Sequence, residues 1–191
     1  MEQKKAMIAM SGGVDSSVAA RLMLDAGFDC MGATMRLYDG ENPETPGSCC
    51  SADDAEDARS VARKLGIPFH VFNCKSEFDK KVIQDFISCY EAGLTPNPCI
   101  LCNRELKFGL LLQKALELGC DKVVTGHYAR IEQDAATGRY LLKKAPDTAK
   151  DQTYFLYSLT QHQLSHTLFP LGELSKAQVR QIAQEQGFLN A

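Results

Sequence analysis

A buried strand followed by a glycine turn and a helix is the feature that most constrains this chain. The apolar run over residues 6–10, Ala-Met-Ile-Ala-Met, is typical of a parallel strand covered on both faces. Ser11-Gly12-Gly13 interrupts the run, and from Asp15 onward apolar residues recur at helical spacing. Glycines at such a turn let backbone N–H groups approach a ligand, and a helix start adds a positive dipole end. The turn is therefore suited to a phosphate.

The segment from Ile8 to Ser17, IAMSGGVDSS, differs from other glycine-rich phosphate loops. It has no lysine where the Walker-type loop needs one, and its glycine spacing is not that of the dinucleotide fingerprint. Its serine hydroxyls can donate to phosphate oxygens, and the Asp15 carboxylate can hold a metal or a cation bound to pyrophosphate. A bare SGG would fit an ordinary serine-capped helix, but the strand before it and the helix after it favour phosphate binding.

Strands alternate with helices along most of the chain. We expect strands over residues 30–35, 67–72 and 122–125, and helices over 52–65, 78–90 and 106–118. This alternation predicts an α/β fold with a doubly wound parallel sheet, in which ligands bind at the carboxyl ends of the strands. The glycine turn, Met35 and Gly126-His127 all follow expected strands, so these distant segments should meet at one crevice.

The last part of the sequence predicts a hairpin and further helices. The hairpin should span residues 129–144 with its turn at 134–138, and helices should span 150–158 and 175–187. We expect an α/β domain over residues 1–146 and a short helical extension over 147–191. Because the sequence stops directly after a helix end, we also expect it to be part of a longer protein.

Charge and hydropathy exclude several classes of protein. The 191 residues include 21 Lys and Arg against 24 Asp and Glu, a net charge of −3. Any nucleic-acid surface would therefore have to be a local patch. No apolar run reaches membrane-spanning length, and the start Met-Glu-Gln-Lys-Lys lacks the apolar core of a signal peptide. We expect a cytoplasmic protein with no membrane partner.

Eight cysteines in such a chain indicate free thiols, metal ligands or catalysis rather than disulfides. Four of them lie in apolar or helical segments and should be small buried hydrophobes: Cys30, Cys74, Cys89 and Cys120. The sequence leaves the role of the adjacent pair Cys49-Cys50 open. Cys99 and Cys102 form a CxxC pair directly after the rigid turn Thr95-Pro96-Asn97-Pro98.

The CxxC pair has three possible roles. A helix beginning near residues 103–105 would put Cys102 at a positive helix end, where a thiol loses its proton more readily, and Arg104 and Lys107 would act in the same direction. This favours a nucleophilic or sulfur-carrying Cys102 with Cys99 assisting. A zinc site would need the vicinal cysteines as further ligands, and disulfide exchange usually follows a thioredoxin-like pattern that is absent. No metal site is firmly predicted.

Five segments in colinear order resemble the tRNA-uridine 2-sulfurtransferases, the tRNA 2-thiouridylases of the MnmA/TrmU family: SGGVDSS, LTPNPCILCNRELKFG, TGHYAR, KDQTYFL and FPLGELSKAQVRQIA. The resemblance covers essentially the whole chain and implies the PP-loop, adenine nucleotide alpha hydrolase-like fold. It further implies that ATP, with Mg²⁺, adenylates the C2 oxygen of a wobble uridine in tRNA. A protein persulfide then delivers sulfur and AMP leaves. A cysteine desulfurase or a sulfur-carrier protein is the implied sulfur donor.

The resemblance also assigns individual residues. Those implied to bind ATP are Ala9, Met10, Ser11, Gly12, Gly13, Val14, Asp15, Ser16, Met35 and Gly126. Those implied to meet the target base are Asn97, Pro98 and Cys99, and those implied to contact tRNA are His127, Lys150, Asp151 and Gln152. Cys102 would be the nucleophile, and it is grouped with Asp15 as catalytic. Ordinary packing or helix capping would be the structural explanation for several of these residues taken alone.

The chain departs from the family pattern in two ways. Many members carry Asp where Cys99 stands, so Cys99, Cys102 and a third cysteine could ligate an iron–sulfur cluster. Members also continue further, with a second catalytic cysteine and a β-barrel. We therefore expect residues 147–191 to lead into a truncated tRNA-binding domain, and this chain to bind ATP without completing thiolation. The alternatives are another PP-loop ATP pyrophosphatase and a non-catalytic ATP- or tRNA-binding module.

Overall fold

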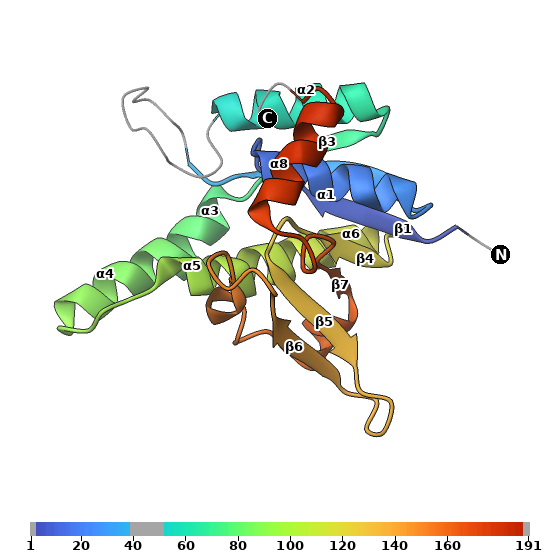
Figure 1. Ribbon diagram of the computed structural model, residues 1–191. Coiled ribbons are helices and arrows are strands. Elements are labelled where there is room, and N and C mark those ends of the chain that lie inside the picture. The colour runs from blue at the N-terminus through green and yellow to red at the C-terminus, as the bar shows by residue number, and fades with distance from the viewer. Residues whose placement is uncertain (1–2, 39–51, 189–191) are drawn as a thin grey trace.

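A parallel five-stranded sheet forms the centre of the molecule (Figure 1). The computed structural model describes residues 3–38 and 52–188. The strand order is β3-β2-β1-β4-β7, and every neighbouring pair is parallel. The bounds are β1 Lys5–Ala9, β2 Asp29–Arg36, β3 Phe69–Asn73, β4 Lys122–Val124 and β7 Thr167–Leu168. The predicted doubly wound α/β class is confirmed, and the chain reverses its direction of travel across the sheet between β1 and β4.

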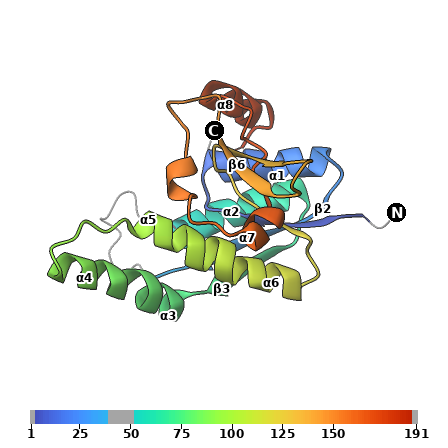
Figure 2. The same ribbon diagram turned by 90° about the horizontal axis from the view of Figure 1, so that it is seen from below.

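Helices cover both faces of this sheet (Figures 1 and 2). One face carries α1 (Val14–Asp25), α2 (Ala52–Leu65) and α8 (Lys176–Glu185). The other carries two long helical runs. The first consists of α3 (Lys75–Phe78), the π-helical η1 (Asp79–Ile83) and α4 (Gln84–Glu91), and the second of α5 (Pro98–Leu101), the π-helical η2 (Cys102–Leu110) and α6 (Leu111–Glu117).

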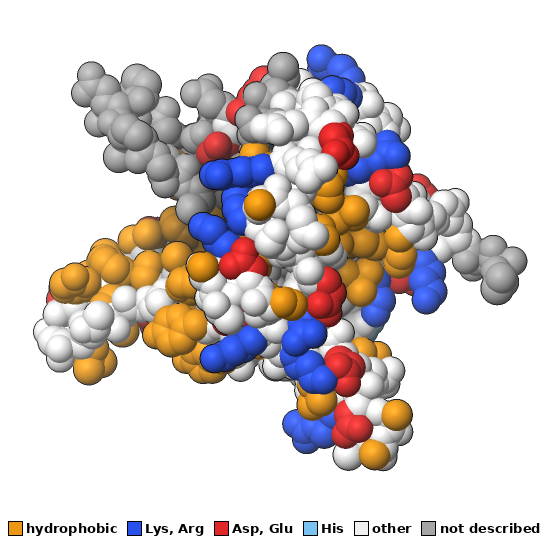
Figure 3. Space-filling view, in the orientation of Figure 1, with side chains coloured by type: hydrophobic (Ala, Val, Ile, Leu, Met, Phe, Trp, Pro, Cys, Tyr) orange, Lys and Arg blue, Asp and Glu red, His pale blue; other side chains and the backbone are white. Residues whose placement is uncertain are grey.

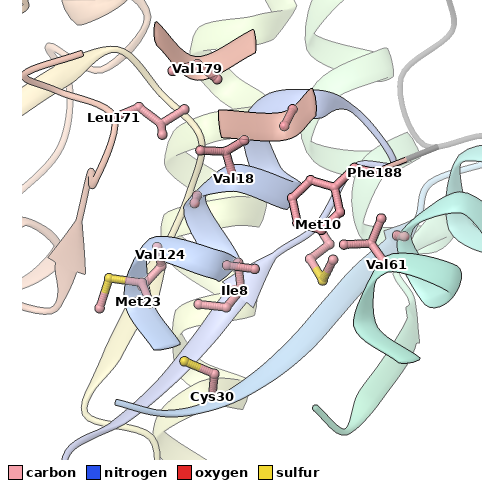
Figure 4. Close-up of a cluster of buried hydrophobic side chains, with 14 of the residues drawn as sticks. Ile8, Met10, Val18, Met23, Cys30, Val61, Val124, Leu171, Val179 and Phe188 are labelled. Carbon is pink, nitrogen blue, oxygen red and sulfur yellow. The ribbon is translucent and has the colours of Figure 1, made fainter. Parts of the chain in front are cut away.

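Successive side chains of β1 point alternately into two hydrophobic cores. Ile8 and Met10 point to the side of α1 and α8, where Val18 and Val179 meet them (Figure 4). Met7 points to the opposite side, among the apolar residues of η2 and α6. Since successive strand residues face opposite ways, an unbroken apolar run is what a strand covered on both faces requires. Each fully buried apolar side chain contributes roughly 1.5–3 kcal/mol.

The second helical run begins earlier than the sequence suggested. The Asn97 Oδ1 accepts a hydrogen bond from the Cys99 N–H at 3.2 Å, and Pro98 occupies the first helical position. This Asn-Pro pair is a favoured helix start, so the expectation of a start near residues 103–105 is wrong. Cys102 therefore lies beyond the first turn, and the helix-end argument made for its thiol loses its geometric basis.

The end of α4 and the loop that follows it expose apolar side chains. Ile87, Tyr90 and Leu94 are 43%, 64% and 61% exposed. Figure 3 shows hydrophobic side chains gathered over this projecting part of the molecule. The run of α3, η1 and α4 extends beyond the sheet here, so no strand of the described residues covers this end (Figure 1).

The predicted hairpin is confirmed as β5 (Ala129–Gln133) and β6 (Tyr140–Lys144), which pair antiparallel. The helix expected over 150–158 is wrong, since only Thr153–Phe155 form a 3₁₀ turn, η3. Hydrogen bonds of Asp151 and Gln152, including bonds to residues outside this segment, hold it instead. Both carboxylate oxygens of Asp151 accept, one from the Ala145 N–H and one from the Thr153 hydroxyl, and the Gln152 N–H donates to the Tyr128 carbonyl.

The segment after residue 146 joins the same sheet and core. The helix predicted over 175–187 is confirmed as α8, which starts at the expected Ser175 cap and packs against α1. The sequence did not predict α7 (Gln161–Ser165) or β7, which pairs with β4. A domain limit after residue 146 stays a prediction.

No helix in the described ranges, 3–38 and 52–188, combines the length and apolar character needed to cross a bilayer.

Candidate nucleotide-binding site

A cavity of about 200 Å³ lies at the carboxyl ends of β1, β2 and β4. Residues implied to bind ATP that line it are Ala9, Met10, Ser11, Asp15, Ser16, Met35 and Gly126. His127 and Gln152, which were implied to contact tRNA, also line it. The cavity lies where the strand order reverses, the position at which open α/β sheets bind ligands. The structure thus brings the three strand-end segments together, as expected.

Two glycines allow the backbone to close around this cavity. Gly12 has φ +76°, and a Cβ built on it would lie 2.5 Å from the Asp54 carbonyl oxygen. A Cβ on Gly126 would lie 2.8 Å from the Asp15 carbonyl carbon and 2.9 Å from the Ser16 amide nitrogen. Neither position has room for a side chain. The end of β4 consequently lies directly against the first turn of α1.

The glycine loop is held in shape by its serines. The Ser11 N–H donates to the Ser16 hydroxyl oxygen at 3.2 Å, and that hydroxyl donates to the Gly13 carbonyl at 3.0 Å. The Ser17 hydroxyl donates to the same carbonyl at 3.1 Å. Helix α1 has no side-chain cap, because its N-cap residue is Gly13. Its first-turn N–H groups are therefore suited to receiving an anion.

The Asp15 carboxylate is tied to two distant segments. Its Oδ1 accepts from the Tyr128 hydroxyl at 2.9 Å and pairs with the Lys176 ammonium at 2.6 Å. Burial and the hydrogen bond to Asp15 raise the pKa of the Tyr128 phenol, which stays a neutral donor. Sequence reasoning missed Tyr128 and Lys176, which are 113 and 161 residues away from Asp15. No local signal could have found them.

His127 is a buried, neutral side chain at the cavity. Its Nδ1 lies 2.7 Å from the Thr125 hydroxyl, and its ring packs against Phe108 and Phe169 at centroid distances of 6.0 and 5.9 Å. Burial, and secondarily the charge of Lys107, holds the pKa of this imidazole well below 6.5. His127 can therefore exchange a hydrogen bond with a ligand without carrying charge.

The CxxC segment does not line the cavity. Cys99 is exposed on the first turn of its helix, while Cys102 is half-buried and packs at the edge of the core that contains Cys74. Asn97 uses its side-chain oxygen as the helix cap. Lys150 is exposed and, like Asp151, does not line the cavity.

The described residues do not offer a complete metal centre. No group of three or more His, Cys, Asp or Glu side chains comes together within residues 3–38 and 52–188. Cys99 and Cys102 supply two thiols, and Cys49 and Cys50 lie outside the described residues. An iron–sulfur cluster needs more ligands than this part of the chain provides.

Five lining residues escaped the assignment by sequence: Ala33, Thr34, Lys107, Leu111 and Thr125. Ala33 and Thr34 precede Met35 at the end of β2, and Thr125 follows β4, so the strand-end rule could have found them. Lys107 and Leu111 come from the helical run beneath the sheet. Only the packing of that run decides which of its side chains reach the cavity.

A parallel sheet with a glycine loop after its first strand and a cavity at its carboxyl edge defines the fold of the PP-loop ATP pyrophosphatases. A solved 4-thiouridine synthetase–RNA complex with bound ATP aligns with a TM-score of 0.63 at 20% identity, covering 97% of this chain and 41% of that one. The U34-tRNA thiolase NcsA of Methanococcus maripaludis, with its [4Fe-4S] cluster, aligns with a TM-score of 0.58 at 17% identity, covering 100% and 61%. At these identities the likeness concerns the fold alone.

The chain belongs to the tRNA methyl transferase HUP domain family, whose sequence profile matches residues 4–191. It is 57% identical to the tRNA-specific 2-thiouridylase MnmA of Clostridioides difficile over 96% of this chain and 51% of that protein. It is 53% identical to the protein of the same name from Caldicellulosiruptor saccharolyticus over 96% and 52%. The chain therefore spans about half the length of the curated relatives it matches.

Proposed function

We propose that this chain is the ATP-binding and substrate-activating part of a tRNA-uridine 2-sulfurtransferase. The observation that carries the proposal is the cavity in which the SGGVDSS loop, Met35 and Gly126 meet at the carboxyl edge of the sheet. It occurs in a chain that is 57% identical to half of a tRNA-specific 2-thiouridylase. The wider activity is a proposal because the other half of those relatives lies outside the match.

The residues at the cavity fit a nucleotide. The backbone from Ala9 to Ser16, together with the Ser11 and Ser16 hydroxyls, would hold the phosphates, with Gly12, Gly13 and Val14 completing the loop. Met35 and Gly126 would flank the adenine and ribose. The absence of a Cβ at Gly12 and Gly126 keeps the backbone close enough for its N–H groups to donate.

Magnesium would enter with the nucleotide. Among the described residues, Asp15 is the one carboxylate that lines the cavity. Mg²⁺ is commonly held by one or two carboxylates together with substrate phosphates, so a single carboxylate fits this mode of binding. When bound, the ion would neutralise phosphate charge. The ion pair between Asp15 and Lys176 would then have to rearrange.

The reaction that fits best is adenylation followed by sulfur transfer. The C2 oxygen of a wobble uridine attacks the α-phosphorus of ATP, and pyrophosphate leaves. The outer sulfur of a persulfide carried by Cys102 attacks C2 and displaces AMP. The thiolate of the second catalytic cysteine that the resemblance implies then attacks the Cys102 sulfur, so that the S–S bond breaks, 2-thiouridine leaves and a disulfide forms between the two cysteines. Asn97, Pro98 and Cys99 would meet the target base. His127, Lys150, Asp151 and Gln152 would contact tRNA, and the lining positions of His127 and Gln152 are compatible with a flipped nucleotide.

Three further expectations belong to this proposal. A cysteine desulfurase or a sulfur-carrier protein is the proposed sulfur donor, and the cytoplasm, where tRNA is modified, is the proposed location. An iron–sulfur cluster on Cys99 and Cys102 stays a prediction, and the described residues place no third ligand beside them. Anaerobic reconstitution of the full-length protein, with iron analysis of the wild type and of Cys99→Ser, tests it, and absence of bound iron would reject it.

Pyrophosphate release tests the proposal. Adding ATP and a tRNA with a wobble uridine to the full-length protein should release pyrophosphate and form 2-thiouridine, and a tRNA with cytidine at that position is the control. Cys102→Ala should keep pyrophosphate release and lose 2-thiouridine. Binding of ATP and tRNA without pyrophosphate release would instead indicate a binding module. Formation of 2-thiouridine by the 191-residue chain alone would show that our expectation of an incomplete enzyme is wrong.

A further inference from the structure

Lys107 is a cation that lines the nucleotide cavity without a partner among the described residues. It is half-buried on η2 and is the one lysine or arginine among the described residues that line this cavity. Within residues 3–38 and 52–188 its ammonium forms no hydrogen bond or ion pair, whereas Lys176 is paired with Asp15. An ammonium at the lining of this cavity is suited to an anionic ligand, because charge-assisted hydrogen bonds to phosphate oxygens are stronger than neutral ones.

Lys107 lies on the π-helical element η2, Cys102–Leu110. In a π-helix each N–H bonds to the carbonyl five residues earlier, so residues five apart lie on one face. Leu106 and Leu111 accordingly share one core, and the buried Asn103 and Phe108 share another side. By the same rule Lys107 lies one turn beyond Cys102 on a common face. Such π-helical turns are rare and frequently occur at functional sites.

Gln163 ties this turn to α7. Its Nε2 donates to the Arg104 carbonyl at 3.1 Å and to the Phe108 carbonyl at 3.0 Å, so its amide spans the turn that carries Lys107. The Gln163 Oε1 accepts from the Thr160 N–H at 2.9 Å, which fixes the orientation of the amide. Gln163 does not line the nucleotide cavity. Its side-chain contacts with the lining elements are those to η2, so η2 is the route by which its amide would affect a nucleotide.

The position of Lys107 indicates which phosphate it would meet. Leu111, four residues further along the same helical run, packs in the same core as Ala33 and Met35 at the end of β2, on the side proposed for the base. The glycine loop and the first turn of α1 lie on the other side of the cavity and suit the outer phosphates. Lys107 lies on the helical run that covers the face of the sheet opposite α1, so it enters the cavity from the side proposed for the base and would meet the phosphate nearest the ribose.

We propose that Lys107 is a catalytic residue that binds the α-phosphate of the nucleotide, and that Gln163 is a positioning residue that holds the π-helical turn from which Lys107 reaches it. This inference rests on the proposed function and adds a cationic group to it. The α-phosphorus is the atom attacked during adenylation, so a fixed cation beside it stabilises the charge that develops on its oxygens.

Equilibrium binding of ATP, AMP and adenosine to the 191-residue chain tests this assignment. Lys107→Met should lower the affinity for ATP and AMP by roughly 10- to 100-fold, the range for a lost hydrogen bond to a charged group. It should leave the affinity for adenosine unchanged. Lys107→Arg should recover part of the affinity. Lys80→Met is the matched control, because Lys80 is an exposed lysine on η1 that does not line the cavity. It should change no affinity.

Each other outcome has a defined meaning. Weaker binding of ATP with unchanged AMP would overturn the α-phosphate assignment, because the contact would then be with an outer phosphate. Unchanged binding of both nucleotides with weaker tRNA binding would assign Lys107 to the RNA backbone and overturn the inference. A wild-type chain that binds no ATP would contradict the proposed function itself. Binding by the wild type that Lys107→Met leaves unaltered would contradict this inference alone.

Gln163→Met tests the positioning role, since methionine keeps the length of the side chain but removes the Nε2 donor to η2 together with the Oε1 acceptor of the α7 cap. AMP affinity should fall several-fold, by less than in Lys107→Met, with adenosine binding and the circular dichroism spectrum unchanged. The double variant should bind AMP no more weakly than Lys107→Met, because a residue that acts only through Lys107 has no effect without it. Fully additive losses would overturn the positioning role.

Discussion

Single residues set the dimensions and charge of the cavity. Gly126 allows the end of β4 to touch the first turn of α1, and Gly12 allows the loop to pass Asp54. The neutral ring of His127 and the ion pair of Asp15 with Lys176 leave Lys107 as the uncompensated cation among the described lining residues. Because each of these features depends on one atom group, each can be tested by one substitution.

Gly126→Ala should weaken ATP binding more than it weakens the fold. The new Cβ would lie within 3 Å of Asp15 and Ser16 backbone atoms, so the loop must shift, with an overpacking cost of roughly 1–3 kcal/mol. Gly138→Ala is the control, because Gly138 lies in the hairpin loop, with φ +70°, and a Cβ there meets open space. We expect it to cost about 1 kcal/mol of stability from backbone strain without affecting ATP affinity. Calorimetric titration and thermal unfolding compare the two variants, and equal ATP affinities would contradict the steric argument.

Protonation of His127 should make the fold sensitive to acid. Burial lowers its pKa in the folded state below 6.5, so between the folded and unfolded pKa values the unfolded chain binds more protons. This contribution to stability is present above about pH 6.5 and is lost as pH falls below it, by up to about 1.4 kcal/mol per pH unit. Urea unfolding measured between roughly pH 5 and 8 should show the free energy of unfolding falling more steeply with acid for the wild type than for His127→Gln. If the free energy of unfolding fell equally with pH in both proteins, His127 would not be the source of the acid sensitivity.

Caps and turns decide where the elements that carry the site begin. Asn97 and Pro98 start the helical run of the CxxC segment, and Thr160 with Gln163 starts α7 through a capping box. Ser175 with Gln178 forms a second capping box at the start of α8, directly before Lys176. The cap of α8 therefore also fixes the residue that pairs with Asp15.

Ser175→Ala should destabilise the protein by about 1 kcal/mol, because it removes the hydroxyl that accepts from the Gln178 N–H. Ser175→Asn is the matched control and should retain most of the stability, since asparagine is an equally good N-cap. Chemical denaturation of the three proteins measures the difference. If Ser175→Asn were as unstable as Ser175→Ala, the loss would not come from the cap.

The sheet integrates segments from the whole described chain. β7 pairs with β4, and the buried Leu171, Val179 and Ala183 complete the core over α1. These contacts make the segment after residue 146 part of one packed unit with the loop at the start of the chain. The boundary predicted at that residue is therefore open to a direct test.

A chain ending at residue 146 should fail to fold, because it lacks β7 and α8 and exposes the core beneath them. We expect it to lose the cooperative thermal transition of the 191-residue chain and to bind a hydrophobic dye. Circular dichroism melting and dye fluorescence provide the comparison. A truncated chain that melts cooperatively and binds ATP would instead establish the predicted domain limit.

Much of the fold could be predicted because its signals are local. The apolar run of β1 and the periodicity of α2 were sufficient to place those elements, and α2 was predicted with its observed bounds, Ala52–Leu65. The helix over 150–158 was wrong because tertiary hydrogen bonds of Asp151 and Gln152 override its local pattern. A strand as short as β7 exists only through its pairing with β4, so no sequence period could reveal it.

The sequence by itself determined the class of sheet, the glycine loop and the strand ends that meet around the cavity, because periodicity and turn chemistry act over a few neighbouring residues. Only the tertiary structure decided that Lys107 lines this cavity and that Asp15 is held by Tyr128 and Lys176. Those contacts join residues more than 100 positions apart, or depend on a π-helical turn tied down by Gln163. Their free energy comes from burial and pairing that exist only when the chain is folded.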